Sequence, residues 1–292
     1  MSTPASGDVL HRFVFEGAGI RGELVQLDAT WAAVKEIQDY PPTVATQLGQ
    51  ALVAAALLSA TIKLDGSLIV QVQGAGPLHT LVAQASSRGT LRGLAQWRTE
   101  VPAGPDLEAV FGAGRLVMTA EAPGGERYQG IVDLEGAHLA AALGTYFARS
   151  EQLPTQVWLA AGAERASGLL LQRLPGADSA SDDWHRVLSL AETLTRDELL
   201  SLPPRDLLYR LFHEEVVRLF EPEPLAFRCS CSRGRIEDTL RVLGRAEAES
   251  IVSTDGEIVA DCEFCNRRYR FDAVDVAMLF TEGVAAESAD TH

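Results

Sequence analysis

Alternating apolar and polar residues predict most of the strands in the first part of the chain. Residues 21–27, RGELVQL, alternate in this way and predict a strand with one buried face. Further strand-like segments follow in pairs, each pair separated by a short connection. The pairs span 66–74 and 78–87, 114–122 and 127–134, and 155–163 and 166–174, the middle pair being expected to form a hairpin across residues 123–125.

Segments with helical character lie between these groups of strands, at 29–40, 43–63 and 136–150. Thr43 is expected to cap the second of them. Its most apolar part, ALVAAALLSA at 51–60, is shorter than the about 20 residues that a membrane span needs and predicts a buried helix. Because strands mostly follow strands, with helices between the groups, we predict an α+β domain with a mixed or antiparallel sheet and packed helices.

A helical linker is expected after this domain. Residues 175–183, PGADSASDD, have the composition of a connection, and Thr195 and Glu198 have the spacing of a capping box. A further helix is predicted to restart at Pro203-Pro204 and to continue to the EPEP sequence at 221–224. Its apolar side would hold Leu208, Leu211, Phe212, Val216, Leu219 and Phe220, and its polar side the ion pairs Asp206–Arg210 and Glu214–Arg218.

That apolar side permits two interpretations. Either it simply packs on the preceding domain, or it covers a surface that must become exposed for the protein to function. We therefore expect three parts: residues 1–175 as an N-terminal α+β core with a disordered tail at 1–8, residues 176–227 as a helical linker, and residues 228–292 as a small C-terminal domain.

Charge and composition narrow the classes of function. The 292 residues have a net charge of −15 at pH 7, which argues against binding to nucleic acid or to anionic membranes. Residues 1–17 lack the basic and apolar stretches of a secretory signal, so we expect a cytoplasmic protein. Thiols stay reduced in that compartment, where clustered cysteines indicate metal ligands or redox centres.

All four cysteines lie in two close pairs, Cys229 with Cys231 and Cys262 with Cys265. Residues two apart in an extended segment point to the same side, and a Cys-x-x-Cys turn brings its two thiols together. Two such pairs supply the tetrahedral thiolate set that Zn²⁺ prefers, so we predict one zinc ion per chain. Four unrelated thiols and an iron–sulfur centre are the alternatives.

The zinc would be purely structural or part of a switch. Arg228, Arg233 and Arg235 lie near the first pair, and Arg267 and Arg268 follow the second. Cationic neighbours favour the thiolate over the thiol and make cysteine more sensitive to oxidants. No phosphate-binding loop or paired-histidine metalloprotease motif is found in the sequence, and we expect no enzymatic activity.

These features together resemble the heat-shock protein 33 family of redox-regulated holdase chaperones. Residues 39–83 and 146–160 are similar to two signatures of that family, and CSCSRGRIEDTLRVLG with DGEIVADCEFCNRRYRFDAVDV is similar to its zinc domain. Asn266 stands where the family often has glycine, and Gly234 where it often has a charged residue.

The resemblance implies a mechanism. Residues 1–175 would be the chaperone core and 228–292 the zinc redox switch, inactive while the reduced cysteines hold zinc. Oxidation would form the disulfides Cys229–Cys231 and Cys262–Cys265, release zinc and unfold the small domain and the linker. The exposed apolar surface would bind unfolded client proteins without ATP and prevent their aggregation, and the oxidised protein would be a homodimer.

Two other functions remain open at this point. A zinc ribbon that binds a protein partner or nucleic acid constitutively would share the four-cysteine pattern, although the acidic chain lacks a phosphate-binding face. A thiol–disulfide oxidoreductase would use the CEFC pair at 262–265, which in such proteins usually opens a helix.

Overall fold

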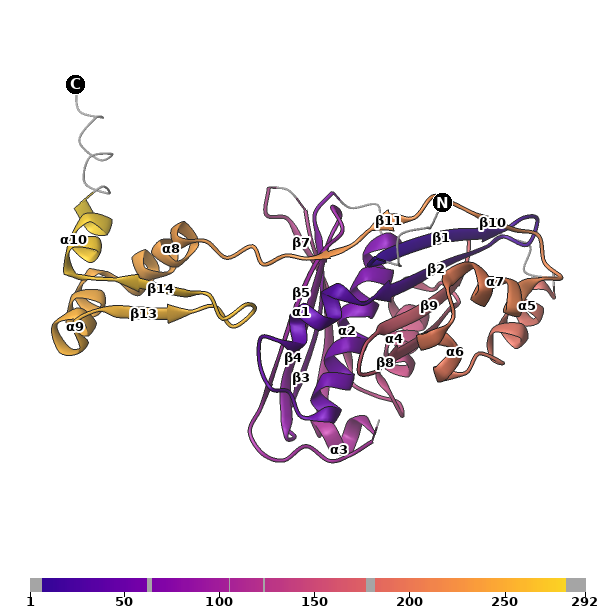
Figure 1. The fold of residues 1–292 in the computed structure, drawn as a ribbon, viewed down its shortest axis with the longest axis horizontal. Coiled ribbons are helices and arrows are strands. Elements are labelled where there is room, and N and C mark those ends of the chain that lie inside the picture. The colour runs from indigo at the N-terminus through magenta and orange to yellow at the C-terminus, as the bar shows by residue number, and fades with distance from the viewer. Residues whose placement is uncertain (1–6, 62–64, 105, 123, 177–181, 282–292) are drawn as a thin grey trace, which may run out of the picture. The chain divides into compact units, whose positions relative to one another are not determined.

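The computed structural model describes residues 7–61, 65–104, 106–122, 124–176 and 182–281, and the chain divides into two compact units, Met1–Arg228 and Cys229–His292 (Figure 1). The larger unit contains two sheets, called here sheet A and sheet B. An α+β fold with mixed and antiparallel sheets and packed helices, as expected from the sequence, is confirmed.

Sheet A is antiparallel throughout and has the strand order β10-β1-β2-β9-β8, with β11 also pairing with β1. Its strands are β1 (Val9–Phe15), β2 (Ile20–Leu27), β8 (Thr155–Ala161), β9 (Ala166–Arg173), β10 (Val217–Leu219) and β11 (Glu223–Pro224). The predicted strands at 21–27, 155–163 and 166–174 are all present.

Sheet B has the order β12-β5-β4-β3-β6-β7 and is antiparallel except for the β12–β5 pair. Its strands are β3 (Ser67–Gly74), β4 (Leu78–Ser86), β5 (Thr90–Trp97), β6 (Gly114–Glu121), β7 (Arg127–Asp133) and β12 (Ala226–Phe227). The predicted hairpin at 114–134 is β6–β7. Strand β5 was not expected from the sequence.

Helix α2 (Pro42–Thr61) packs against both sheets and supplies the centre of the main core. Every residue from Ala51 to Leu58 is buried, which confirms the predicted buried helix. The helix is long and apolar enough to cross a membrane, but 67% of the relevant stretch is buried inside the protein, as in a core helix. The cap predicted at Thr43 is wrong, because the helix already begins at Pro42, whose missing N–H costs nothing in a first turn.

The shorter helices of this unit differ from their predicted ranges. Helix α1 (Ala29–Lys35) stops before the predicted residue 40, and α4 (Leu139–Tyr146) continues as the π-helical turn η1 (Phe147–Glu151). The short helix α3 (Leu107–Phe111) was not expected.

The predicted tail is wrong at Asp8, which is buried. Its carboxylate accepts hydrogen bonds from the backbone amides of Asp28 and Thr30 at 2.5 and 2.6 Å and so closes the first turn of α1. Residues 1–6 lie outside the described residues.

Three linker helices cover the face of sheet A that points away from α2 (Figure 1). They are α5 (Asp183–Ala191), α6 (Arg196–Ser201) and α7 (Pro204–Phe212). The capping box of Thr195 and Glu198 is present, and Pro204 opens α7 as expected. The buried side chains of this second core come from both partners: Phe13, Phe15, Ile20, Leu24, Ala160, Leu169 and Leu171 from the sheet, and Val187, Ala191, Leu199, Leu207, Leu208, Leu211 and Phe212 from the helices.

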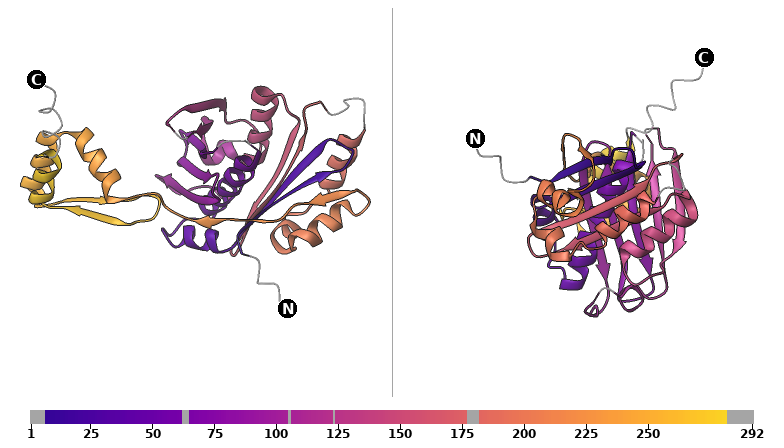
Figure 2. Two further views of the ribbon diagram at one scale, coloured as in Figure 1. Left: turned by 90° about the horizontal axis from the view of Figure 1, so that it is seen from above. Right: turned by 90° about the vertical axis from the view of Figure 1, so that its right-hand side faces the viewer.

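The predicted continuation of the last helix to residue 220 is wrong. Helix α7 ends at Phe212, and the chain from 217 to 228, called here the strap, runs extended along the sheets (Figure 2). Arg210 pairs with Glu198 rather than Asp206, and Arg218 pairs with Glu16. The apolar pattern of these residues has helical spacing, but they form a strand instead. The open edge of β1 satisfies the backbone of the strap by ladder hydrogen bonds.

The small unit has its own short core. It contains α8 (Arg233–Leu243), α9 (Arg245–Asp255), the hairpin β13 (Ile258–Asp261)–β14 (Arg268–Phe271) and α10 (Ala273–Thr281). Gly244 follows the last residue of α8 and separates it from α9, which was not expected from the sequence. Its buried apolar side chains are Leu240, Ala248, Ile258, Tyr269, Phe271, Val276 and Leu279.

A buried carboxylate lies on the inner face of sheet A. Glu23 is 2% exposed, stands opposite Arg12 across the β1–β2 ladder, and has one oxygen 3.9 Å from Arg21. Burial raises the pKa of Glu23 to about 7, although Arg21 and Arg12 act in the opposite direction. Desolvation therefore outweighs the two partly exposed arginines.

We expect Glu23→Gln to raise the free energy of unfolding of the large unit above that of the wild type, and to do so more at pH 8 than at pH 5. Between an unfolded pKa near 4.5 and a folded pKa of about 7, the folded carboxyl keeps a proton that the unfolded chain loses. The free energy of unfolding of the wild type therefore falls as pH rises through this window, by about 3 kcal/mol. Denaturant unfolding followed by tryptophan fluorescence at both pH values measures the difference. The exposed Glu100→Gln is the control, and an equal effect of Glu23→Gln at pH 5 and pH 8 would contradict the prediction.

Candidate metal centre

The first cysteine pair lies on an extended segment between β12 and α8. Cys229 and Cys231 are both half-buried, and the intervening Ser230 is exposed, as expected for residues that alternate in direction. Ser232 then caps α8 by accepting a hydrogen bond from the Arg235 amide at 3.3 Å. This cap ends the extended segment immediately after the second thiol.

The second pair forms the turn of the β13–β14 hairpin. The amides of Cys265 and Asn266 donate to the Cys262 carbonyl at 3.2 and 2.7 Å, and the Cys262 amide donates to the Arg267 carbonyl at 3.0 Å. Asn266 has a φ of 53°, a left-handed conformation that asparagine adopts more readily than most residues. The CEFC pair thus lies in a hairpin turn and not at the start of a helix, where a thiol–disulfide oxidoreductase would carry it.

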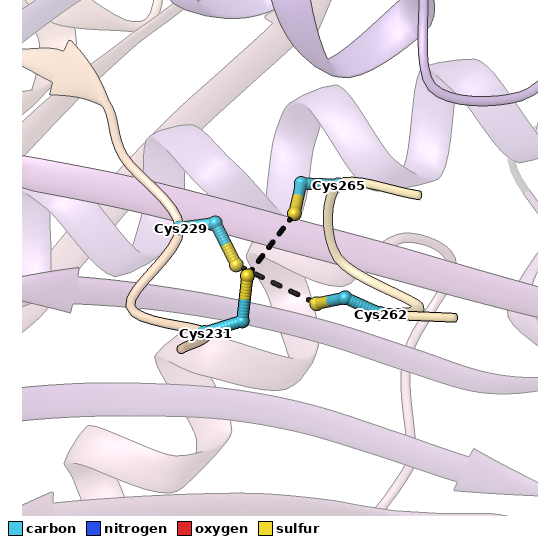
Figure 3. Close-up of side chains that lie close together, drawn as sticks. All are labelled: Cys229, Cys231, Cys262 and Cys265. Carbon is cyan, nitrogen blue, oxygen red and sulfur yellow. Dashed lines mark hydrogen bonds between the residues drawn. The ribbon is translucent and has the colours of Figure 1, made fainter. Parts of the chain in front are cut away.

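The four thiols point toward one another (Figure 3). The Sγ atoms of Cys229 and Cys262 are 3.6 Å apart, those of Cys231 and Cys265 are 3.4 Å apart, and all four lie within 4.8 Å of one another. Four sulfurs at about 2.3 Å from a tetrahedral zinc ion would be about 3.8 Å apart, which this spacing approaches. The cluster can hold a metal ion, and its uniform sulfur donors suit zinc.

The thiols differ in acidity because of their surroundings. Burial acts to raise the pKa of Cys231, but hydrogen bonds from Tyr269 and from the neighbouring thiols lower it to about 7. Burial raises the pKa of Cys262, and burial together with the other thiols raises the pKa of Cys265 to about 12. The surroundings thus favour the thiolate at Cys231 and disfavour it at Cys262 and Cys265.

The flanking arginines contribute less to this acidity than their positions in the sequence indicate. Arg233 pairs with Glu237 and Asp275 and lies over the Phe271 ring, and Arg268 pairs with Asp261. Arg267 interacts with the site itself: its hydrogen bond to Tyr269 first, and then the charges of Cys231 and Cys265, raise the pKa of its guanidinium. Most of the local cations thus stabilise the fold of the small unit.

Sequence reasoning missed Tyr269, which belongs to this site. Its hydroxyl donates a hydrogen bond to the Cys231 Sγ at 3.2 Å, and its ring is part of the small core. The signal was present in the alternation of RYRF in β14, which buries Tyr269 and Phe271 on the side of the hairpin that faces the core.

We expect Tyr269→Phe to lower the affinity for zinc by about tenfold, because an outer hydrogen bond that stabilises a ligand thiolate is lost while the ring remains. Competition with a chromophoric chelator measures the affinity. Tyr209→Phe, an exposed tyrosine of α7, is the control. An unchanged zinc affinity in Tyr269→Phe would show that this hydrogen bond does not support the site.

Comparison with known proteins agrees with this arrangement. The model of the family described as Hsp33 protein matches residues 8–272. The 33 kDa chaperonin of Nitrosococcus oceani is 60% identical over 98% of both chains, and that of Cronobacter sakazakii is 46% identical over 94% of this chain and 95% of its own. The crystal structure of the 33 kDa chaperonin, a heat shock protein 33 homologue, from Thermotoga maritima has the same fold, with a TM-score of 0.83, 23% identity, and coverage of 95% of this chain and 99% of that one.

The fold and the cluster define a class of two-unit α+β proteins whose small C-terminal unit gathers four cysteines. Within that class the chain belongs to the Hsp33 family, which is a family of chaperones.

Proposed function

We propose that this protein is a redox-regulated holdase that binds unfolded proteins without ATP and is inactive while its reduced cysteines hold zinc. The observation that carries the proposal is the gathering of all four thiols of the chain in one cluster inside a unit with little core of its own. Cys229, Cys231, Cys262 and Cys265 would be the ligands, and zinc would supply much of the folding free energy of that unit.

The proposed switch is an oxidation of these four thiols. Each disulfide, Cys229–Cys231 and Cys262–Cys265, forms as two thiols give two electrons and two protons to one peroxide molecule, which leaves as two waters. A disulfide sulfur is no longer a thiolate donor, so the oxidised residues cannot hold the ion. The two short Sγ–Sγ contacts join one segment to the other, as suits ligands of a single ion, whereas the proposed disulfides join neighbours in the sequence.

The small unit is poorly equipped to stay folded without the ion. Beside its short core it exposes several large apolar side chains, with Val242 at 89% and Val274 at 65% exposure. A domain of about 60 residues is only marginally stable on its hydrophobic core alone, and a structural metal commonly supplies part of the missing free energy. Loss of the ion is therefore expected to unfold residues 229–281.

Unfolding is proposed to spread to the linker through residues 213–228, which include the strap and join Phe212 of α7 to Cys229. Helices α5, α6 and α7 are short and amphipathic, and isolated helices of this length are unstable in water. Once they leave, Phe13, Phe15 and Leu24 on sheet A become accessible. A continuous apolar face of this kind binds unfolded chains, and pairing of two such faces would give the proposed homodimer.

We place this activity in the cytoplasm, where thiols are kept reduced until an oxidant arrives. We propose neither nucleic acid nor membrane as a partner, because the net charge of −15 repels both phosphate backbones and anionic lipids.

The test follows zinc, thiols and client binding in one sample. The reduced protein is treated with peroxide at mild heat, and zinc release, free thiols and suppression of aggregation of a denatured client are recorded together. We expect zinc release and antiaggregation activity to rise in parallel, with disulfide mapping identifying the two neighbouring pairs. Release of zinc without antiaggregation activity would exclude the holdase, and constant activity in reduced and oxidised protein would favour a constitutive zinc-ribbon interaction module.

A further inference from the structure

The strap connects to both sheets through its backbone. Strands β10 and β11 pair antiparallel with the edge strand β1, and β12 pairs in parallel with β5, the edge strand of sheet B (Figure 2). The Leu225 amide donates to the Asp8 carbonyl at 2.9 Å, that of Ala226 to Gly89 at 2.9 Å, and that of Arg228 to Leu91 at 3.0 Å. Two edges that would otherwise be open are closed by one segment of the chain.

The side chains of the strap alternate between core and solvent. Leu225 and Phe227 are half-buried and pack against the main core, while Ala226 and Arg228 are exposed. A cavity of about 250 Å³ remains beside Pro224 and Leu225, with an apolar wall of Leu10, Ala60, Ala85 and Leu91 and a polar or glycine rim of Arg12, Ser59, Ser86, Ser87, Arg88, Gly89 and Glu223. The seat of the strap is thus a groove that takes up apolar side chains at every second position of an extended chain and has a polar rim at its Pro224 end.

The β4–β5 turn is shaped to receive that chain. Gly89 has a φ of +73°, and a Cβ added there would lie 2.4 Å from the Pro224 carbonyl oxygen. Only glycine gives the turn this backbone conformation and lets another backbone approach so closely.

Only a few backbone hydrogen bonds hold the strap in this groove. Strand β12 has two residues, and the prolines at 222 and 224 have no N–H to donate. The segment therefore fills the groove without the long backbone pairing that would make it hard to displace. An edge strand beside an apolar groove, once uncovered, is a template for another extended chain.

We propose that the β5 edge and the groove of Leu225 and Phe227 form a client-binding site, and that the strap occupies it as a built-in mimic of the client. The ligand is an extended segment of an unfolded protein with apolar residues at alternate positions, added to sheet B as a strand. This inference rests on the proposed holdase function and adds a second client-binding site, with a defined binding mode, to the face of sheet A under α5–α7.

The probe is a fluorescent peptide of residues 221–228, EPEPLAFR, whose register on β5 is known from the strap. Its binding is measured by anisotropy to the full-length protein in three forms: reduced wild type, oxidised wild type and reduced Leu225→Asp. The substitution places a charge in the apolar groove and should release the strap without removing any cysteine. Ala226→Asp puts the same charge on the exposed neighbour and is the matched control.

We expect binding to oxidised wild type and to reduced Leu225→Asp, and little to reduced wild type or Ala226→Asp. Hydrogen exchange of residues 222–228 reports whether the strap has left in each form. Gly89→Ala in the oxidised protein should weaken peptide binding by about tenfold, because the turn can no longer approach the ligand backbone.

N-methylation of the peptide backbone distinguishes strand addition from nonspecific hydrophobic binding. N-methylation at the peptide positions of Ala226 and Arg228 removes the two amides that donate to β5 and should weaken binding by about tenfold or more. N-methylation at Phe227, whose amide points to the other edge of the strand, should have a much smaller effect. A permanently unfolded protein such as reduced carboxymethylated lactalbumin should displace the peptide.

Three results would overturn the inference: equal effects of the two methylations, no peptide binding by Leu225→Asp with a released strap, or an unfolded protein that binds without displacing the peptide. A seat refilled by the strap of a second copy would also overturn it; excess EPEPLAFR peptide would separate such a dimer in sedimentation but would leave the proposed homodimer, which pairs through sheet A, intact. If antiaggregation activity persists in any of these cases, the proposed holdase function is still supported, and only the proposed binding site is excluded. Failure of the holdase itself is read from the peroxide experiment.

Discussion

Cys231→Ser is expected to abolish tight zinc binding and to unfold residues 229–281 while the N-terminal α+β core before the linker stays folded. Structural zinc sites contribute about 10–16 kcal/mol, so an even share for each thiolate is about 3 kcal/mol, or more than a hundredfold in affinity. Cys231 also has the lowest thiol pKa in the cluster for which a shift is resolved, about 7, and accepts the Tyr269 hydrogen bond. Its removal therefore takes away a thiolate that its surroundings stabilise.

Zinc content by elemental analysis and hydrogen exchange of the two units measure this outcome. The main core around α2 and the sheet residues beneath the linker should keep their protection, whereas the strap and helices α5–α7 should lose theirs, because they are proposed to follow the small unit. Ser230→Ala, between the two cysteines, removes one hydrogen bond from Arg235 but no ligand, and should keep full zinc content. Unaltered zinc stoichiometry and affinity in Cys231→Ser would show that Cys231 is not a ligand.

Phe212→Asp is expected to activate the protein without an oxidant. Phe212 is 2% exposed and packs edge-on against Phe15, with ring centroids 4.9 Å apart. Loss of such a ring costs about 3–5 kcal/mol, and burial of a carboxylate adds to this. Helix α7 has nine residues and depends on packing for its stability, so the linker should leave sheet A while the small unit keeps zinc.

The measurement is suppression of client aggregation by reduced, zinc-loaded Phe212→Asp, with an apolar dye reporting the uncovered sheet. Tyr209→Asp places the same charge on the same helix at a side chain that is 73% exposed, and should remain inactive. Limited proteolysis within 183–216 confirms release of the linker. A released linker without client binding would mean that the face under α5–α7 is not part of the holdase surface.

Local patterns in the sequence predicted much of the fold and the composition of the site. Each member of the cluster was predictable from spacing, because a Cys-x-Cys in extended chain and a Cys-x-x-Cys turn each bring two thiols together over a few residues. The strand pairs β3–β4, β6–β7 and β8–β9 were predictable for the same reason, since their partners are neighbours in the sequence.

Contacts between distant segments were not predictable in this way. Tyr269 reaches Cys231 across 38 positions, Asp8 reaches the first turn of α1, and Glu23 is desolvated by packing between β1, β9 and α2. Each of these depends on which surface lies next to the side chain, and a single sequence carries no local signal for that.

The strap shows most clearly where local sequence patterns stop being sufficient and tertiary contacts decide the structure. Residues 213–220 have an apolar pattern that fits a helix, and the thiols nine residues further on can be assigned from their spacing alone. The thiol pairs are local geometry and follow from the residues themselves. Whether Val217–Phe227 becomes helix or strand depends on the free edges of β1 and β5, which exist only after the two sheets have formed and which satisfy the backbone of the strap where a helix would leave those edges unpaired.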